Sequence, residues 1–362
     1  MRVHQIINSF SENRGGAERI ARRLHLGLLD RGVDAHLVAI EDCETAGLAA
    51  ARSFGLGSAY DLRALPLLGR YVRANVGEED IVHAHLFPTS AYVATLSMLG
   101  AIKGSCVFTE HNTWNRRRSH AFGPLLDRFV YGRYLRLFAI SKGTCIELID
   151  ARPYLGDRVE VVENGAELHF RTMPERTPKT VPTILAMGRL TPQKNFATLL
   201  EALARLPAES FQCIVLGEGE LREQLEAQAF FLGLEASVAF KGHVPDVHAY
   251  LQDADIFVIP SLWEGFGLAV VEAMNAGLPV VASNVPGLSE IVGTEGDCAK
   301  LIDPRNPDSI AAALGALIAT PDLRYQLGFR GFARAKQFST RRMVANYVTS
   351  YETLSGEHIA RA

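Results

Sequence analysis

A chain of 362 residues is longer than a single compact core usually supports, so we expect two domains. Apolar residues make up 48% of the composition, enough to fill two cores, and the net charge of −3 excludes a general electrostatic attraction to nucleic acid. The five cysteines include no Cys-x-x-Cys pair, which favours reduced thiols over disulfides or a metal site. Since no apolar run reaches the ~18–20 residues of a membrane span, we expect a cytoplasmic protein.

Short apolar runs alternate with longer amphipathic segments through the first half of the chain. The expected strands are 2–7, 34–40, 80–84, 105–109, 137–140 and 159–162. The expected helices are 17–30, 61–74, 89–99, 122–134 and 142–150. This alternation predicts a parallel sheet with helices on both faces, and ligands bind such sheets at the carboxyl ends of the strands.

Three segments of this half, at the carboxyl ends of expected strands, contain candidate ligand-binding residues. Gly15 and Gly16 open a helix, where the backbone can approach a ligand closely, although an ordinary turn has the same pattern. His83 and His85 alternate along a strand and share one face; without a third ligand nearby, satisfied structural histidines explain them better than a metal site. His111 follows the strand 105–109 and is a candidate for a catalytic loop.

Six arginines and one acidic residue occur between positions 116 and 136, interleaved with aromatic and aliphatic side chains. This pattern is typical of a helix that rests on anionic lipid or holds a phosphorylated substrate. A packed helix with a solvated basic face is the alternative interpretation. We expect Arg116, Arg117 and Arg118 to bind an acceptor or the anionic inner face of the membrane.

The second half repeats the alternation after a stretch rich in charge, threonine and proline at 169–182, which we interpret as a linker. The expected strands are 183–187, 212–216, 237–240, 255–259, 279–282 and 299–302, and the expected helices are 196–206, 221–232, 247–252, 268–276, 309–317 and 322–335. The sequence thus predicts two Rossmann-like, doubly wound α/β domains, 1–168 and 183–339, facing across a cleft. A final helix within 340–362 would cross back to the first domain.

Four consecutive strand–helix loops of the second half combine glycine with charged side chains. Arg189 and Lys194 supply two cations after the first strand. Glu264 lies in the loop before a helix that begins near Leu268, and Glu272 lies inside that helix. A helix N-terminus between two acids suits a ligand with a diphosphate and several hydroxyls, whereas the alternative is a turn with solvated acids. The two remaining loops are Gly217-Glu218-Gly219 and Gly242-His243-Val244.

These residues resemble the retaining glycosyltransferases of family 4, which have the two-domain glycosyltransferase B fold. The resemblance extends over essentially the whole chain. The motifs that carry it are Glu264-x7-Glu272 with Gly265-Phe266-Gly267-Leu268 inside, Gly188-Arg189-Leu190 through Lys194, Gly15-Gly16-Ala17-Glu18, and Asn164-Gly165.

The resemblance implies a UDP- or GDP-type sugar donor held mainly by the second domain, and a glycan or lipid-linked acceptor held by the first. It implies no cofactor and no metal, and no Asp-x-Asp metal signature occurs in the loops named above. The implied catalytic set is Glu264, His111, Arg189 and Lys194. The implied donor-binding set is Gly15, Gly16, Gly188, Arg189, Lys194, Gly217, Glu218, His243, Val244, Glu264, Gly265, Phe266, Gly267, Leu268 and Glu272.

The roles implied for single residues differ. Arg189 and Lys194 would bind the diphosphate, Glu272 would accept hydrogen bonds from the ribose, and His243 would lie near the base. The product would belong to a cell-surface polysaccharide or glycolipid. Two alternatives share the fold: a nucleotide-sugar 2-epimerase, which needs no acceptor, and a non-catalytic partner subunit, which would not need this set of polar residues.

Overall fold

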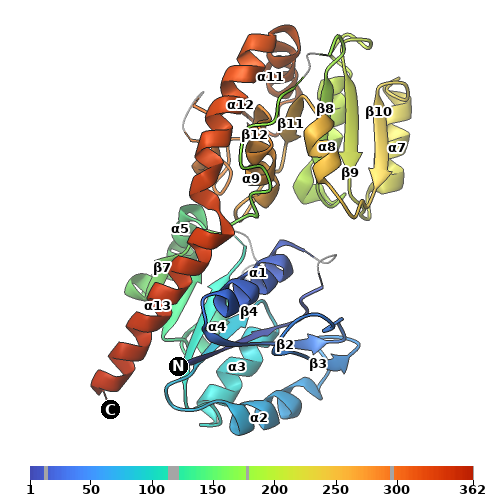
Figure 1. Ribbon diagram of the computed structural model, residues 1–362. Coiled ribbons are helices and arrows are strands. Elements are labelled where there is room, and N and C mark those ends of the chain that lie inside the picture. The colour runs from blue at the N-terminus through green and yellow to red at the C-terminus, as the bar shows by residue number, and fades with distance from the viewer. Residues whose placement is uncertain (12–14, 113–121, 177–178, 294–296, 362) are drawn as a thin grey trace. The chain divides into compact units, whose positions relative to one another are not determined.

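The computed structural model of the protein describes residues 1–11, 15–112, 122–176, 179–293 and 297–361. The chain forms two compact units (Figure 1). The first consists of Met1–Gly165 with Thr340–Ala362, and the second of Ala166–Ser339.

The first unit is a seven-stranded sheet in the order β3-β2-β1-β4-β5-β6-β7, in which every pairing is parallel. Its strands are β1 (Arg2–Ile7), β2 (Asp34–Glu41), β3 (Ala51–Leu56), β4 (Ile81–His85), β5 (Ser105–Glu110), β6 (Arg136–Ala139) and β7 (Val159–Val161). Its helices are α1 (Gly16–Asp30), α2 (Ala64–Asn75), α3 (Thr89–Met98), α4 (Gly123–Tyr131), α5 (Lys142–Ala151), the 3-10 helix η2 (Pro153–Arg158) and α13 (Thr340–Arg361).

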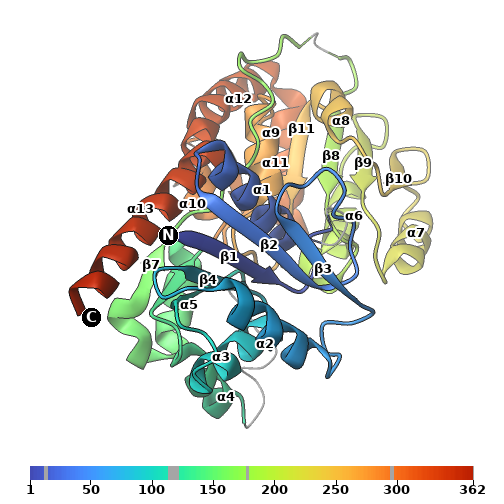
Figure 2. The same ribbon diagram turned by 60° about the horizontal axis from the view of Figure 1, so that its bottom comes forward.

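The two faces of this sheet are buried by different helices (Figure 2). Successive side chains of a strand point to opposite faces. Ile6 of β1 belongs to the core that contains Leu68 of α2 and Val93 of α3, whereas the next residue, Ile7, packs in a second core with Ala21 of α1. The helices α1 and α13 contact each other, so the second face is closed by the last helix of the chain.

The packing of α13 on the first unit depends on a glycine. A β-carbon on Gly27 of α1 would lie 2.5 Å from a methyl carbon of Val344 in α13, closer than side-chain atoms pack. Tyr347 and Tyr351 of α13 are fully buried in the same unit. The final helix therefore completes the core of the first unit.

The second unit is a six-stranded parallel sheet in the order β10-β9-β8-β11-β12-β13. Its strands are β8 (Thr183–Met187), β9 (Gln212–Leu216), β10 (Val238–Gly242), β11 (Ile256–Ile259), β12 (Val280–Ser283) and β13 (Ala299–Ile302). Its helices are η3 (Pro192–Lys194), α6 (Phe196–Leu203), α7 (Arg222–Phe231), α8 (His248–Asp253), α9 (Leu268–Asn275), α10 (Ser289–Val292), α11 (Pro307–Ala319), α12 (Pro321–Ala335) and η4 (Lys336–Phe338). Both sheets confirm the two predicted doubly wound domains.

The segment 169–182, which we expected to be a linker, belongs to the second unit. Phe170 and Asn275 exchange two hydrogen bonds of 3.0 Å through the side-chain amide of Asn275. The guanidinium of Arg176 donates to four backbone carbonyl groups of the same unit. The charge and proline content of residues 169–182 therefore does not distinguish a linker from a segment of the domain surface, because Phe170 and Arg176 are hydrogen-bonded to the second unit.

Local sequence explains where several helices begin. The hydroxyl of Ser141 accepts a 3.0 Å hydrogen bond from the backbone N–H of Thr144 and caps α5. Asn306 caps α11 in the same way, and Pro307 occupies the first helical position, where no N–H is needed.

Candidate functional site

The strand order of the second sheet reverses direction between β8 and β11. From β8 the sheet grows toward β9 and β10 on one side and toward β11, β12 and β13 on the other. Ala186 pairs with Val258, so the two strands end side by side and their loops leave the sheet together. Parallel sheets bind ligands at such a switch point.

The loops after β8 and β11 are bonded to each other. The backbone N–H of Leu262 donates to the carbonyl of Gln193 at 2.8 Å, and the Gln193 side chain donates to the carbonyl of Trp263 at 2.9 Å. Asn195, in the left-handed conformation with φ +56°, donates its amide to the carbonyl groups of Pro260 at 3.1 Å and Pro304 at 2.7 Å. These bonds hold the two loops in one arrangement.

An ion pair between Lys194 and Glu264 joins the charged groups of the two loops. The same carboxylate oxygen of Glu264 accepts a 2.9 Å hydrogen bond from the hydroxyl of Ser261. The side chains of Lys194 and Glu264 are 20% and 10% exposed. A β-carbon on Gly188 would lie 3.2–3.4 Å from three carbons of the Lys194 side chain, so the lysine lies across this glycine.

The same two loops also carry a second cation and lead into a helix N-terminus. Arg189 is exposed, and no acidic group among the described residues pairs with it. The helix α9 begins after Gly267, which has φ +91°, and the first N–H groups of a helix have no partner within it. Arg189, Lys194 and the start of α9 together can bind an anion.

The motif around α9 contributes backbone more than side chains. The side chains of Phe266 and Leu268 are buried, and the ring of Phe266 packs on Phe338 with centroids 5.7 Å apart. Glu272 lies in α9 and is 9% exposed. Gly265 lies between Glu264 and Phe266 in the loop. Of these residues, only the glutamates have polar side chains that could contact a ligand.

The glycines at the carboxyl ends of β8, β9 and β10 pack against one another. A β-carbon on Gly217, which has φ +129°, would lie 2.0 Å from the carbonyl oxygen of Gly188. The N–H of Gly217 donates to the carbonyl of Gly242 at 2.8 Å. The carboxylate of Glu218 is bound by the guanidinium of Arg222 at 2.5 Å. Nearby in the sequence, His243 is exposed and Val244 is half-buried.

Six predicted residues belong to the first unit or lie outside the described residues. Gly15 and Gly16 stand at the N-terminus of α1, as predicted from the sequence. His111 is 8% exposed, and its Nε2 lies 3.1 Å from Nδ1 of His85. Burial lowers the pKa of His111 to about 3. The three arginines 116–118 lie outside the described residues.

The histidines of β4 are satisfied within the protein, as the structural interpretation predicted. Nδ1 of His83 lies 2.6 Å from the hydroxyl of Tyr351, and its Nε2 lies 2.7 Å from the hydroxyl of Thr109. In the part of the chain that the structure describes, no group of three or more His, Cys, Asp or Glu side chains could hold a metal ion. None of the described helices is long and apolar enough to cross a membrane.

Several residues of this site were missed from the sequence. The two loops are organised by Ser261, Gln193 and Asn195. Of these, only Asn195 carries a local signal, since asparagine favours both helix starts and the left-handed conformation.

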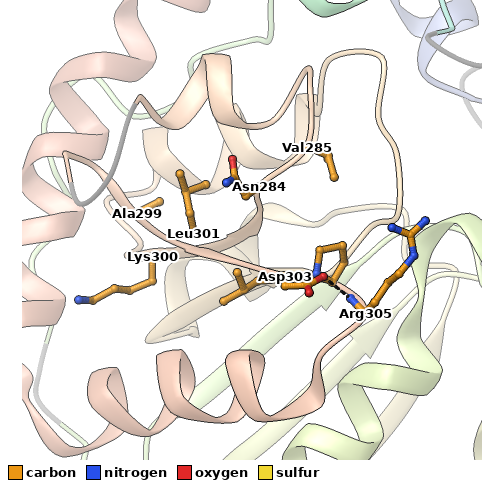
Figure 3. A pocket seen from close by; sticks show the side chains of 9 residues that line it. Asn284, Val285, Ala299, Lys300, Leu301, Asp303 and Arg305 are labelled. Carbon is orange, nitrogen blue, oxygen red and sulfur yellow. Dashed lines mark hydrogen bonds between the residues drawn. The ribbon is translucent and has the colours of Figure 1, made fainter.

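A pocket of about 630 Å³ was also missed from the sequence (Figure 3). Its lining residues are Asn284, Val285, Ala299, Lys300, Leu301, Ile302, Asp303, Pro304 and Arg305. In Figure 3, Lys300 and Arg305 lie at opposite ends of the pocket.

Two family models match the sequence. Glycosyltransferase Family 4 matches residues 14–170, and Glycosyl transferases group 1 matches residues 172–334. Together the two matches account for most of both units.

Individual relatives agree with these matches. The chain is 37% identical over 241 residues to the MMP alpha-(1->4)-mannosyltransferase of Mycolicibacterium hassiacum. This match covers 65% of this chain and 58% of the relative. It is 36% identical over 235 residues to the O-antigen chain mannosyltransferase B of Escherichia coli, covering 60% of each. The matched segments thus span about three fifths of the length of these relatives. The phosphatidyl-myo-inositol mannosyltransferase of Mycolicibacterium smegmatis is 28% identical, with 84% of this chain and 79% of the relative covered.

Solved structures share the fold at low sequence identity. HepE of Anabaena, in complex with UDP and glucose, superposes with a TM-score of 0.83 at 19% identity, covering 98% of this chain and all of that one. Sucrose-phosphate synthase of Thermosynechococcus elongatus also gives a TM-score of 0.83 at 19% identity, covering 99% of this chain and all of that one. With the two family matches, this establishes that the chain belongs to glycosyltransferase family 4 and has the glycosyltransferase B fold.

Proposed function

We propose that this protein is a retaining, metal-independent glycosyltransferase that moves a sugar from a nucleotide-diphosphate sugar to a glycan or lipid-linked acceptor. One observation carries the proposal. At the switch point of the second sheet, the Lys194–Glu264 pair and the exposed Arg189 lie on two loops that are bonded to each other, and one of these loops leads into α9. This arrangement suits a diphosphate better than a neutral ligand.

The chemistry of the leaving group gives these cations a task. When the bond between the sugar and the diphosphate breaks, negative charge grows on the departing phosphate. Arg189, Lys194 and the N–H groups of α9 would stabilise that charge more strongly in the transition state than in the ground state. Because they supply positive charge themselves, the reaction would proceed without a divalent metal. Undiminished activity in EDTA is the expected result.

The ion pair separates the roles of the two glutamates. Glu264 accepts hydrogen bonds from Lys194 and Ser261, so its carboxylate orients the lysine. Glu272 would accept hydrogen bonds from the ribose of the donor. In the retaining reaction that we propose, the departing phosphate takes the proton of the acceptor, and neither glutamate acts as a base. Proton NMR of the first product formed should show the anomeric configuration of the donor.

The relatives guide the choice of substrates. Their names include mannosyltransferases that act on phosphatidyl-myo-inositol or an O-antigen chain, and HepE binds UDP with glucose. We therefore place this protein in the synthesis of cell-surface polysaccharides or glycolipids, with mannose as the first sugar to test and UDP and GDP as the first nucleotides.

Membrane contact through the first unit is part of the proposal. At α4, Phe122 is 80% exposed and Leu125 is 69% exposed, and Arg128 on the next turn is exposed as well. Other residues of the helix are buried, among them Asp127, which is paired with Arg152 at 2.7 Å. The helix thus packs through one side and presents apolar and basic groups on the other, which suits an anionic bilayer surface at the cytoplasmic side.

Thermal-shift measurements with UDP, GDP, ADP and their sugar conjugates test the donor site. A nucleotide at 100 times its dissociation constant should stabilise the protein by ~2.7 kcal/mol. Arg189→Gln should reduce the shift, whereas Lys300→Gln, in the pocket of Figure 3, should leave it unchanged. If none of the nucleotides shifts the transition, the proposal fails.

Incubation with a single sugar nucleotide separates the two enzymatic interpretations. A glycosyltransferase should leave UDP-N-acetylglucosamine unchanged until an acceptor is added. Rapid epimerisation of that donor alone would identify a 2-epimerase instead. A non-catalytic subunit would show no turnover with any pair of donor and acceptor, although it could still bind the nucleotide.

A further inference from the structure

One face of the first sheet carries a row of polar side chains. The strand register pairs Gln5 with His83 and His85 with Thr109. Since alternate residues of a strand share a face, His111, two residues after Thr109, continues the row. All five residues are buried. The helices α1 and α13 cover this face, so every polar atom in the row needs a partner from the protein or from a ligand.

The orientation of the Gln5 amide follows from the backbone of α1. Its nitrogen donates to the carbonyl of Ala21 at 3.3 Å and to Nε2 of His85 at 3.2 Å, and its oxygen accepts from the backbone N–H of His25 at 3.2 Å. The opposite orientation would place the amide nitrogen against an N–H and the amide oxygen against a carbonyl. Backbone polarity cannot change, so α1 selects one orientation.

The orientation of Gln5 determines the protonation of two histidines. Because Nε2 of His85 accepts from Gln5, the proton of the neutral ring lies on Nδ1. Nδ1 of His85 is 3.1 Å from Nε2 of His111 and donates to it. The proton of neutral His111 then lies on its own Nδ1.

That last nitrogen is left without a partner. Nδ1 of His111 is buried and has no hydrogen-bond partner among the residues that the structure describes. A buried donor without a partner is unfavourable, so Nδ1 of His111 needs an acceptor beyond the described residues, and a substrate oxygen can supply one. Burial lowers the pKa of His111 to about 3 and that of His85 well below its usual value, so both rings are neutral near pH 7.

We propose that Gln5 and His85 are positioning residues that fix His111 as the neutral Nδ1–H tautomer, which donates a hydrogen bond to a substrate oxygen. The ligand role rests on the proposed function, whereas the tautomer does not. His111 in this state cannot accept a proton at Nδ1, so it orients the substrate and does not act as a base there. The hydrogen bonds of His83 to Tyr351 and Thr109 lie beside this relay but do not enter it.

NMR of the full-length protein labelled with 15N-histidine tests the tautomer directly. Long-range 1H–15N correlations distinguish a protonated ring nitrogen from a bare one, and His111→Gln identifies the signals of His111. Near neutral pH, the wild-type protein should show a protonated Nδ1 and a bare Nε2 at His111. A protonated Nε2 would overturn the proposal without any variant.

Gln5→Glu should reverse the relay, because a carboxylate accepts hydrogen bonds and does not donate them. His85 would then donate from Nε2 and accept at Nδ1, and the proton of His111 would move to Nε2. We expect kcat/KM to fall by about tenfold when the proton of His111 moves to Nε2. Tyr351→Phe is the matched control: it removes a buried hydrogen bond of His83 and should leave the tautomer of His111 unchanged. With the introduced carboxyl ionised and the His85 ring still neutral in the same spectra, an unchanged tautomer of His111 in Gln5→Glu would refute the relay.

The two proposals fail in different ways. If His111 is the Nδ1–H tautomer and the protein binds no sugar nucleotide, the relay stands and the proposed function falls. If the protein transfers sugar while His111 carries its proton on Nε2, the function stands and the relay falls.

Discussion

The Lys194–Glu264 pair should contribute measurably to the stability of the second unit. Fully exposed ion pairs contribute about 0–1 kcal/mol, whereas removing one partner of a buried pair costs about 3–5 kcal/mol. Side-chain exposures of 20% and 10% place this pair between those limits. We expect Lys194→Met or Glu264→Gln to lower the free energy of unfolding by about 2 kcal/mol each. Because each change removes the same interaction, the double variant should lose about 1–2 kcal/mol less than the sum.

Urea unfolding of the two single variants and the double variant measures this coupling. Trp263, next to Glu264, is one of two tryptophans in the chain, and Trp114→Phe leaves it as the sole reporter. Its fluorescence then follows the unit that contains the pair. The free energy at zero urea comes from linear extrapolation of the transition.

The result that would refute the reasoning is additivity. A coupling energy below about 0.5 kcal/mol would show that Lys194 and Glu264 behave as an exposed pair. Arg222 and Glu226 provide the matched control in the same unit, with N and O atoms 2.9 Å apart and both side chains more exposed. The control pair should couple more weakly than Lys194 and Glu264.

Three further predictions concern pH, backbone and membrane contact. Burial lowers the pKa of His111 to about 3 in the folded protein, against 6.5 for an ordinary histidine, so its contribution to stability is complete above pH 6.5 and is lost toward pH 3 at ~1.4 kcal/mol per pH unit. When the free energy of unfolding in urea is plotted against pH across this range, the slope for His111→Gln should be smaller by about one proton, and an unchanged slope would contradict the prediction. Gly217→Ala should lower the free energy of unfolding by more than ~2 kcal/mol, because the new β-carbon would clash with a backbone oxygen. The control Gly233→Ala, at φ +69° with no atom within 4 Å of the new β-carbon, should lower it by only ~1–2 kcal/mol, and equal losses of stability in thermal unfolding would refute the clash. Phe122→Ser with Leu125→Ser should abolish flotation with anionic vesicles at low salt, and a wild-type protein that does not float would rule out membrane contact.

Most of the fold could be predicted because its strands are buried and its helices amphipathic. Strands β1, β8, β9 and β13 have the predicted bounds. Strand β3 was missed, since Ala51–Leu56 contains neither an apolar run nor a regular alternation and pairs only with β2 at the edge of the sheet. An edge strand of this kind is held by its neighbour more than by its own sequence. The four-residue helix α10 was missed as well, because it is too short for periodicity to appear.

The candidate site was predictable in its members but not in its contacts. Lys194 and Glu264 are 70 positions apart, and their pairing depends on β8 lying beside β11, an order that periodicity does not reveal. The same limit applies to His85 and His111, which were considered separately although a hydrogen bond joins them. Ser261 carries no signal at all, because a serine in a loop before a helix is common. Sequence identifies the loops, and strand order decides which side chains meet.

The position of α13 has a consequence for biosynthesis. The strands of the first unit are complete at residue 161, yet the helix that covers one face of their sheet begins at Thr340. The ribosome must add the 174 residues Ala166–Ser339 in between, which takes about 10–35 s at 5–20 residues per second. During that interval part of one face of the nascent sheet lacks its cover. That face carries the polar side chains of Gln5, His83, His85 and Thr109, which can form hydrogen bonds with water. The partly covered sheet is therefore less prone to aggregate than one with an entirely apolar face.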